Sequence, residues 1–242
     1  MLIVNTTRQE IIKYLPSHNN VCEIGVDLGF YSNDILNSCN PKSLHLIDPW
    51  IHIDDPDYKN DTVNVDNSRQ EEKYRSVLKR FSNEILSGQV KVHRGFSYDV
   101  LPTFPTEYFD WVYIDGMHTF EGLLKDLDLC YNKVKDNGFI LGHDYANHEV
   151  AKYVNFGVID AIKYFTKHVP GCELLAITLE SGWPSYILYK NNGPHVDHVI
   201  YNFITKTSNP IDISDDLWKD INFFQKWFMI DGNKYVTCLY KG

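Results

Sequence analysis

Short runs of apolar residues alternate with stretches of helical periodicity along most of this 242-residue chain. Five apolar runs predict buried strands, at residues 21–24, 43–47, 90–93, 111–114 and 139–142. Helices are predicted among and after them, at residues 30–39, 68–86, 120–134 and 150–167. Because continuous apolar strands that alternate with helices suit a parallel sheet buried on both faces, this pattern predicts a doubly wound α/β fold.

Two further strands are predicted where the alternation ends, at residues 173–178 and 185–189. The turn residues Gly182, Trp183 and Pro184 separate them, and so short a connection predicts an antiparallel hairpin. After the turn at 191–194, we expect an amphipathic helix at 213–228 and a last strand at 235–240. The sequence therefore predicts a main domain at residues 1–190 and a C-terminal appendage at 191–242, which caps the site or forms an oligomer interface.

The charge balance limits the kinds of partner. The chain has 23 Lys and Arg residues against 32 Asp and Glu residues, a formal net charge of -9, which disfavours nucleic acid. No run approaches the roughly 18 apolar residues of a membrane span. The five cysteines are scattered and show no CxxC pair, which indicates reduced thiols. We expect a soluble cytoplasmic protein whose main partner is neither nucleic acid nor a membrane.

Glycines and an acid follow the first predicted strand of the alternation. The turn reads Glu23-x-Gly25-x-x-x-Gly29 and lies where open α/β sheets bind nucleotides. It lacks the third glycine of dinucleotide-binding turns, which helps to expose the helix N-terminus to a pyrophosphate. S-adenosylmethionine carries no phosphate, and its cationic groups favour a nearby acid. The turn therefore predicts a site for S-adenosylmethionine, with Glu23, Gly25 and Gly29 contacting it.

Polar side chains also follow the next four strands. Asp48 is placed to accept hydrogen bonds from ribose hydroxyls, and Ser97 follows a strand where an adenine edge could bind. Asp115 and His118 follow the fourth strand, and we assign both to the cofactor site as well. Asp144 follows the fifth strand. Because the carboxyl ends of parallel strands meet at one edge, we expect these side chains to share one site.

These motifs resemble those of a known family. The runs Glu23-x-Gly25-x-x-x-Gly29, Ile47-Asp48-Pro49-Trp50, Ile114-Asp115-Gly116-x-His118 and Gly142-His143-Asp144-Tyr145 resemble the class I methyltransferases. More narrowly, they are similar to the small-molecule and sugar O-methyltransferases, which include macrocin O-methyltransferase. The resemblance covers about residues 19 to 190. It implies a Rossmann-like sheet, mostly parallel with an antiparallel terminal hairpin, and methyl transfer from S-adenosylmethionine to a hydroxyl group.

The resemblance also implies a divalent cation and a base. In that family an acid after the fourth strand and a pair of acids after the fifth hold the cation. Asp115 and Asp144 match two of these acids, but His143 replaces the third, which favours a transition metal over Mg²⁺. The family's base position is Met117 here, so His118 and His143 are the candidate bases. Alternatively, His118 caps the following helix or bonds the cofactor, and His143 orients Asp144.

Two other functions compete with the O-methyltransferase. A non-catalytic, methyltransferase-like binding module is compatible with Met117 and His143. A dinucleotide-dependent oxidoreductase would use a related sheet, but the missing third glycine disfavours it. The sequence identifies neither the acceptor nor the oligomeric state, and a homo-oligomer is one alternative. The acidic loop at 49–66 is either a solvated loop or a lid.

Overall fold

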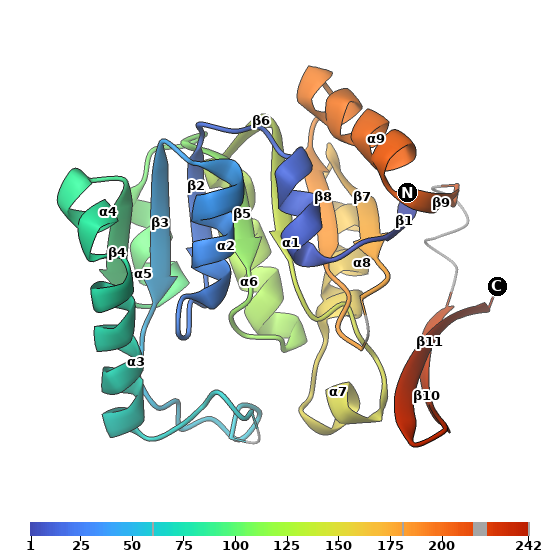
Figure 1. The fold of residues 1–242 in the computed structure, drawn as a ribbon, viewed down its shortest axis with the longest axis horizontal. Helices are drawn as coiled ribbons and strands as arrows, with labels where there is room; N and C mark the ends of the chain where they lie inside the picture. The colour runs from blue at the N-terminus through green and yellow to red at the C-terminus, as the bar shows by residue number, and fades with distance from the viewer. Residues whose placement is uncertain (60, 181, 215–221, 242) are drawn as a thin grey trace.

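A computed structural model describes residues 1–59, 61–180, 182–214 and 222–241. Within these residues, nine strands form one sheet in the order β4-β3-β2-β5-β6-β8-β7-β1-β9 (Figure 1). The strands are β1 (Leu2–Asn5), β2 (Asn20–Ile24), β3 (Ser43–Asp48), β4 (Val90–Arg94), β5 (Phe109–Ile114), β6 (Val134–Gly142), β7 (Cys172–Thr178), β8 (Tyr186–Lys190) and β9 (Ser208–Asp212). The five strands from β4 to β6 run parallel, whereas β8 is antiparallel to both of its neighbours. The predicted Rossmann-like sheet with an antiparallel hairpin is confirmed.

Helices cover both faces of this sheet. They are α1 (Arg8–Ile11), α2 (Phe30–Cys39), α3 (Asn67–Arg80), α4 (Ser82–Ser87), α5 (Ser97–Val100), α6 (Phe120–Lys133), α7 (Glu149–Tyr153), α8 (Val158–His168) and α9 (Pro194–Lys206). One hydrophobic cluster joins the sheet to α6 and α8, and a second joins it to α1, α2 and α9. Figure 1 shows α1 and α2 in front of the sheet and α6 and α8 behind it. The layers are therefore helix, sheet and helix.

The strands predicted in the main domain all form, but two predicted helices are interrupted. The helix predicted at 68–86 breaks at Phe81 into α3 and α4. The helix predicted at 150–167 becomes α7 and α8, separated by residues 154–157. Gly157 lies in this break, where an added Cβ would come within 2.5 Å of the Phe120 nitrogen. This close approach requires a glycine, which ends one helix and allows the next to pack beside α6.

The C-terminal region differs most from expectation. The predicted helix at 213–228 is wrong where it can be compared, because residues 222–228 belong to β10 (Asn222–Ile230) and residues 215–221 lie outside the described part. β10 pairs antiparallel with β11 (Asn233–Lys241), which contains the predicted strand at 235–240. Asp231 and Gly232 form the turn with φ values of 50° and 77°. Two consecutive positive φ values are typical of the Asp-Gly turns that close two-residue hairpins.

The elements that were not predicted include the strands β1 and β9 and the helices α1, α5 and α9. β1 pairs parallel with β7 and antiparallel with β9, so residues from both ends of the sequence meet at this edge of the sheet. Cys22, Cys39, Cys130 and Cys172 are buried free thiols. None of the helices in the described ranges is both long and apolar enough to cross a bilayer.

A buried histidine pair joins β3 and β4. His45 is 3% exposed, and its Nδ1 lies 3.0 Å from Nε2 of His93. The hydroxyl of Tyr108 lies 3.3 Å from Nε2 of His45, and the Phe104 ring packs edge-on against the imidazole. Burial, together with the neighbouring His93, lowers the pKa of His45 to about 3. The pair therefore stays neutral in the folded protein at pH values where an exposed histidine is protonated.

We expect the folded protein to lose stability as the pH falls from about 6.5 towards 3, because the unfolded chain then binds a proton at His45 that the folded chain excludes. Between about pH 7 and pH 5, this histidine alone would cost about 2 kcal/mol of unfolding free energy. In urea denaturation, His45→Gln should reduce the pH-dependent loss, whereas His198→Gln on exposed helix α9 should leave it unchanged. Identical pH slopes for wild type and His45→Gln would contradict the assignment.

Candidate functional site

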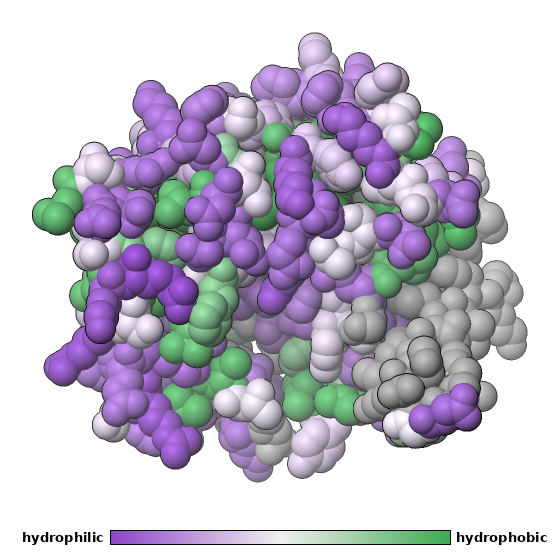
Figure 2. Space-filling view, viewed as in Figure 1, coloured by the Kyte–Doolittle hydropathy of each residue, from purple (hydrophilic) through white to green (hydrophobic). Residues whose placement is uncertain are grey.

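A cavity of about 490 Å³ opens where the parallel strands end. Residues after β2, β3, β4, β5 and β6 all line it, and Figure 2 shows a hollow at this edge of the molecule. The long loop after β3 contributes six further lining residues: Pro49, Ile51, Ile53, Tyr58, Asp61 and Val63. The loop thus lies over the cavity, as expected of a lid rather than of a purely solvated loop.

The glycine turn after β2 brings two strand ends into close contact. Gly25 has a φ of 82°, and a Cβ added to it would lie 2.0 Å from the carbonyl oxygen of Asp115. The Gly25 nitrogen donates to the Ile47 carbonyl at 3.0 Å. Gly29 has a φ of 71° and precedes α2, where a Cβ would meet the Phe81 ring at 2.9 Å. Both glycines are therefore needed for backbone conformation and for close packing.

Glu23 is the next-to-last residue of β2 and lines the cavity. Its side chain is buried and accepts a hydrogen bond from the hydroxyl of Ser32. Burial raises the pKa of Glu23 to about 8, although the Ser32 hydrogen bond acts in the opposite direction. Glu23 therefore holds its proton near neutral pH, and a cation bound beside it would favour the ionised form.

Asp48 ends β3 and holds the glycine turn in place. Its Oδ2 accepts from the backbone nitrogens of Val26 at 2.9 Å and Asp27 at 3.0 Å. Its Oδ1 accepts from the Trp50 nitrogen at 2.7 Å, where the lid loop begins. A carboxylate has about four acceptor positions, so three backbone hydrogen bonds leave acceptor capacity for a ligand. Burial still raises the pKa of Asp48, although these three bonds act to lower it.

Ser97 lies at the start of α5, and its hydroxyl donates to Asp126. Asp126 is a buried carboxyl of α6 that lines the same part of the cavity, and burial raises its pKa to about 6. Beside it, the ring of Tyr98 stacks on Phe96 and lies 3.6 Å from Nζ of Lys125. The sequence analysis missed Asp126, because an acid inside an amphipathic helix carries no local signal that it faces a cavity.

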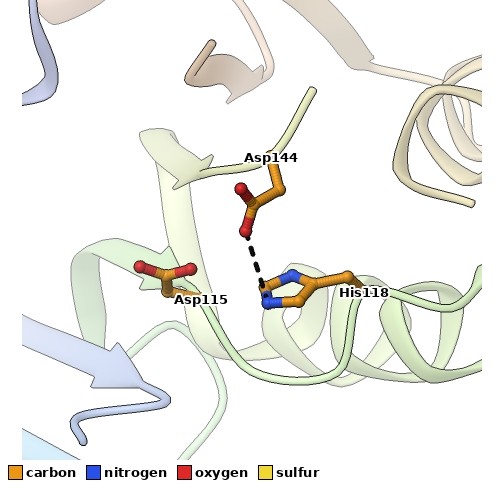
Figure 3. A group of neighbouring side chains, drawn as sticks. All are labelled: Asp115, His118 and Asp144. Atoms are coloured by element: carbon orange, nitrogen blue, oxygen red, sulfur yellow. Dashed lines mark ion pairs between the residues drawn. The ribbon is translucent and has the colours of Figure 1, made fainter. Parts of the chain in front are cut away.

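Two histidines and two acids meet beside the turn. Nε2 of His118 lies 3.3 Å from Oδ2 of Asp144, and Nδ1 of His143 lies 3.2 Å from its Oδ1. Nδ1 of His143 is also 3.9 Å from Oδ1 of Asp115. Figure 3 shows the Asp144 carboxylate, after β6, directed at the His118 ring, with Asp115 on the other side. The structure thus brings together every residue predicted for catalysis or metal binding.

The charged groups in this cluster shift one another's pKa values. Burial would raise the pKa of Asp144, but His118 and then His143 outweigh it, so the pKa is lowered. Burial would lower the pKa of His143, but its hydrogen bond to Asp144 and the charge of Asp115 raise it. Burial raises the pKa of Asp115, against the effect of His143. Near neutral pH, Asp144 is therefore ionised and His143 favours its protonated form.

The cluster also meets a geometric requirement for a cation site. Single ligand atoms of Asp115, His118 and Asp144 all lie within 4.8 Å of one another. Two carboxylate oxygens and an imidazole nitrogen suit a transition metal better than Mg²⁺, which prefers oxygen ligands in octahedral geometry.

Arg8, from α1, completes this part of the cavity. Its Nη1 lies 2.9 Å from Oδ2 of Asp115, and its guanidinium lies 4.8 Å from the centre of the Tyr31 ring. The Tyr31 hydroxyl donates to the Arg8 carbonyl at 3.1 Å. The sequence analysis missed Arg8, because it lies before the first recognisable motif and reaches the site only through the fold.

Aromatic rings form the wall beyond His118. The Phe156 ring lies 4.5 Å from the His118 ring and 5.4 Å from that of Trp183, measured between ring centres. Trp183 follows Gly182, whose carbonyl accepts from Nε2 of Gln225 in β10 at 3.0 Å. Gln225 also exchanges two hydrogen bonds of 3.1 Å with Asn147. Residue 225 of the tail therefore holds two loops that lie beside this wall.

Comparison with known proteins gives a family and a fold. Residues 22–145 match the model of a protein family, and this family is described as a methyltransferase domain. No curated protein matches the chain. Among solved structures, an rRNA methylase from Streptococcus thermophilus is 9% identical, with a TM-score of 0.51 over 76% of this chain and 94% of that one.

Two further solved structures share the fold. The N-methyltransferase NodS from Bradyrhizobium japonicum WM9 is 10% identical, with a TM-score of 0.53 over 76% of this chain and 93% of that one. SMU.1697c from Streptococcus mutans, in complex with SAH, is 8% identical, with a TM-score of 0.51 over 75% and 94% of the two chains.

Replacing Gly25 with Ala should destabilise the protein more than the same change at Gly88. Both residues have a φ near 80°, but a Cβ at Gly88 meets nothing within 4 Å, whereas one at Gly25 overlaps the Asp115 backbone. The left-handed conformation costs an alanine about 1–2 kcal/mol at either position. We expect Gly25→Ala to lose at least about 2 kcal/mol more in urea unfolding, since it adds a backbone overlap. Equal losses of unfolding free energy in the two variants would show that the ends of β2 and β5 can move apart without cost.

Proposed function

Since the chain belongs to the methyltransferase-domain family, we propose that it transfers the methyl group of S-adenosylmethionine to a hydroxyl group of a small molecule or sugar. One contact carries this function. Asp144 lies 3.3 Å from Nε2 of His118, in the same cavity as the glycine turn and Asp48. A histidine held by a carboxylate is a common proton acceptor, and here it stands next to a nucleoside-type site.

The residues around the cavity fit the cofactor. In strand order, Ser97 follows β4, Asp48 ends β3, Gly25 follows β2 and Asp115 follows β5. This order supports adenine near Ser97 and Asp126, ribose at Asp48, and the cationic sulfonium end near Asp115. Acids predominate in the lining, which suits a positively charged nucleoside without phosphate. The dinucleotide alternative lacks both the third glycine and a family match.

The residues on the acceptor side supply the proton chemistry. When bound, the cofactor supplies a methyl group on a cationic sulfur, which an acceptor oxygen attacks in line. The Asp144 carboxylate, 3.3 Å from Nε2 of His118, favours the tautomer with the proton on Nε2, which would leave Nδ1 of His118 to take the hydroxyl proton. His143 is the poorer base, because its raised pKa favours the form that already carries a proton. That form lowers the pKa of Asp144. General base catalysis of this kind contributes about 10²–10⁴-fold.

A divalent cation is the second proposal for the same side chains. Asp115, Asp144 and His118 would hold it, and it would polarise the acceptor hydroxyl. Arg8 already pairs with Asp115 at 2.9 Å, so a metal would have to compete with this cation. A neutral imidazole has only one basic nitrogen, so His118 cannot bind a metal and accept a proton at the same time. We favour the base.

The small-molecule acceptor is supported by charge. A net charge of -9 and an acidic cavity disfavour RNA, although the structural neighbours include rRNA methylases. We propose that the hairpin of β10 and β11 acts at the acceptor end, since Gln225 contacts Asn147 and the loop that carries Trp183. The buried free thiols are compatible with a cytoplasmic protein. A non-catalytic binding module is the remaining competitor.

The cofactor assignment is tested by calorimetric titration. Wild type should bind S-adenosylmethionine with a micromolar-range dissociation constant. Asp48→Ala should weaken binding about ten- to hundredfold, because it removes an acceptor for ribose and loosens the turn. Asp128→Ala, on the exposed face of α6, should bind as wild type does. Folded wild-type protein that shows no binding heat would refute the cofactor site.

The base is tested by measuring S-adenosylhomocysteine formation with a panel of hydroxyl-bearing small molecules and sugars. His118→Gln and Asp144→Asn should each lower kcat about 10²- to 10⁴-fold, since they remove the proton acceptor or its orientation. Exposed His195→Gln should retain full activity.

The same assay separates the alternatives. Dialysis against EDTA should leave the wild-type activity unchanged. Activity that disappears with EDTA and returns with Mn²⁺ or Zn²⁺ would establish the metal role instead. Tight cofactor binding without product for any acceptor would favour the non-catalytic module.

A further inference from the structure

Besides His118 and His143, three Lys or Arg side chains line the cavity among the residues that the structure describes: Arg8, Lys73 and Lys125. Two of them lie towards the β3–β4 side. Lys125 lies over the Tyr98 ring, after β4. Lys73 pairs with Asp27 at 2.6 Å and donates to the Val63 carbonyl of the lid at 3.0 Å. Arg8 is the one beside the end of β5, where it pairs with Asp115.

The strand order sets which part of a bound nucleoside Arg8 would meet. Asp48 lies on β3 and Ser97 follows β4, so a nucleoside held by them extends along the rim past β2 towards β5. The substituent on its 5′ carbon then reaches Arg8 and Asp115. For the proposed cofactor this substituent ends in an amino acid, which carries one positive and one negative charge.

Arg8 is held in place before any ligand binds. The Tyr31 hydroxyl fixes its carbonyl at 3.1 Å, and the Tyr31 ring lies under its guanidinium. The side chains of Arg8 and Asp115 are 25% and 22% exposed, so both are partly open to the cavity. Glu23, the other carboxyl nearby, is already engaged by Ser32. A guanidinium has five N–H donors, and its pair with Asp115 uses only part of them.

We propose that Arg8 binds the α-carboxylate of the cofactor's amino-acid end, while Asp115 accepts from its α-ammonium group. The preformed ion pair thereby matches a zwitterion charge for charge. Arg8 is then the residue that selects a nucleoside with a complete amino acid over one without the carboxylate. This inference rests on the proposed function, because it concerns the same cofactor.

The experiment compares three ligands by calorimetry: S-adenosylhomocysteine, its decarboxylated form, and 5′-methylthioadenosine. Wild type should bind S-adenosylhomocysteine at least about tenfold more tightly than the decarboxylated form, which keeps the ammonium but lacks the carboxylate. In Arg8→Gln this preference should fall to about twofold or less, while affinity for 5′-methylthioadenosine stays unchanged. Arg8→Lys should retain part of the preference, since it keeps the charge but not the planar fork.

Arg75→Gln is the matched control, because Arg75 lies on exposed α3 and pairs only with Glu71 among the described residues. It should preserve the full preference. A wild-type protein that binds both homocysteine-type ligands equally would overturn the inference without any variant. An Arg8→Gln protein that still prefers S-adenosylhomocysteine over its decarboxylated form would also overturn it. So would an Arg8→Gln protein whose affinity for 5′-methylthioadenosine falls as much as its affinity for S-adenosylhomocysteine. If wild type binds none of the three, the proposed function fails and the inference fails with it.

Discussion

The contact between the Gly25 turn and the Asp115 backbone is the constraint on which this site depends. A Cβ at Gly25 would lie 2.0 Å from the Asp115 carbonyl oxygen, so the ends of β2 and β5 meet with no room for a side chain. This approach places the cofactor turn directly beside the loop that carries Asp115 and His118. Asp48 then holds the same turn from the other side, through the nitrogens of Val26 and Asp27. The proposed cofactor site and the proposed base thereby share one structural support.

Much of the fold could be predicted, because each of the strands β2 to β6 is a short run of consecutive apolar residues, and such a run indicates a buried strand. The edge β1–β9 could not, since it joins Leu2 to Asp212 and neither segment has a strong pattern of its own. The helix expected at 213–228 was wrong from residue 222 onward. Closely spaced aromatic residues are compatible with both the helical and the strand periodicity, and aromatic side chains favour strands. The Asp231-Gly232 pair was the signal for a hairpin that could have decided the matter.

The candidate site divides in the same way. Seven lining residues could be identified from the sequence, because each lies at or just after the end of a parallel strand, and these strand ends meet at the cavity. They are Glu23, Asp48, Ser97, Asp115, His118, His143 and Asp144. Arg8 and Asp126 were missed. One comes from a four-residue helix before the motifs begin, and the other from the middle of α6. Their positions follow from how helices pack on the sheet, which no short motif encodes. Both are charged groups whose partners lie far away in sequence.

The hydrogen bonds of Gln225 connect the last hairpin to the cavity wall. Its amide spans Asn147, which precedes α7, and Gly182, which precedes Trp183. The strand that carries it pairs with β11 rather than with the central sheet. A substitution in this hairpin can therefore reshape the aromatic wall while the glycine turn and Asp48 stay as they are. Under the proposed function, acceptor choice can evolve at this wall of the cavity independently of the methyl-donor site in the same cavity.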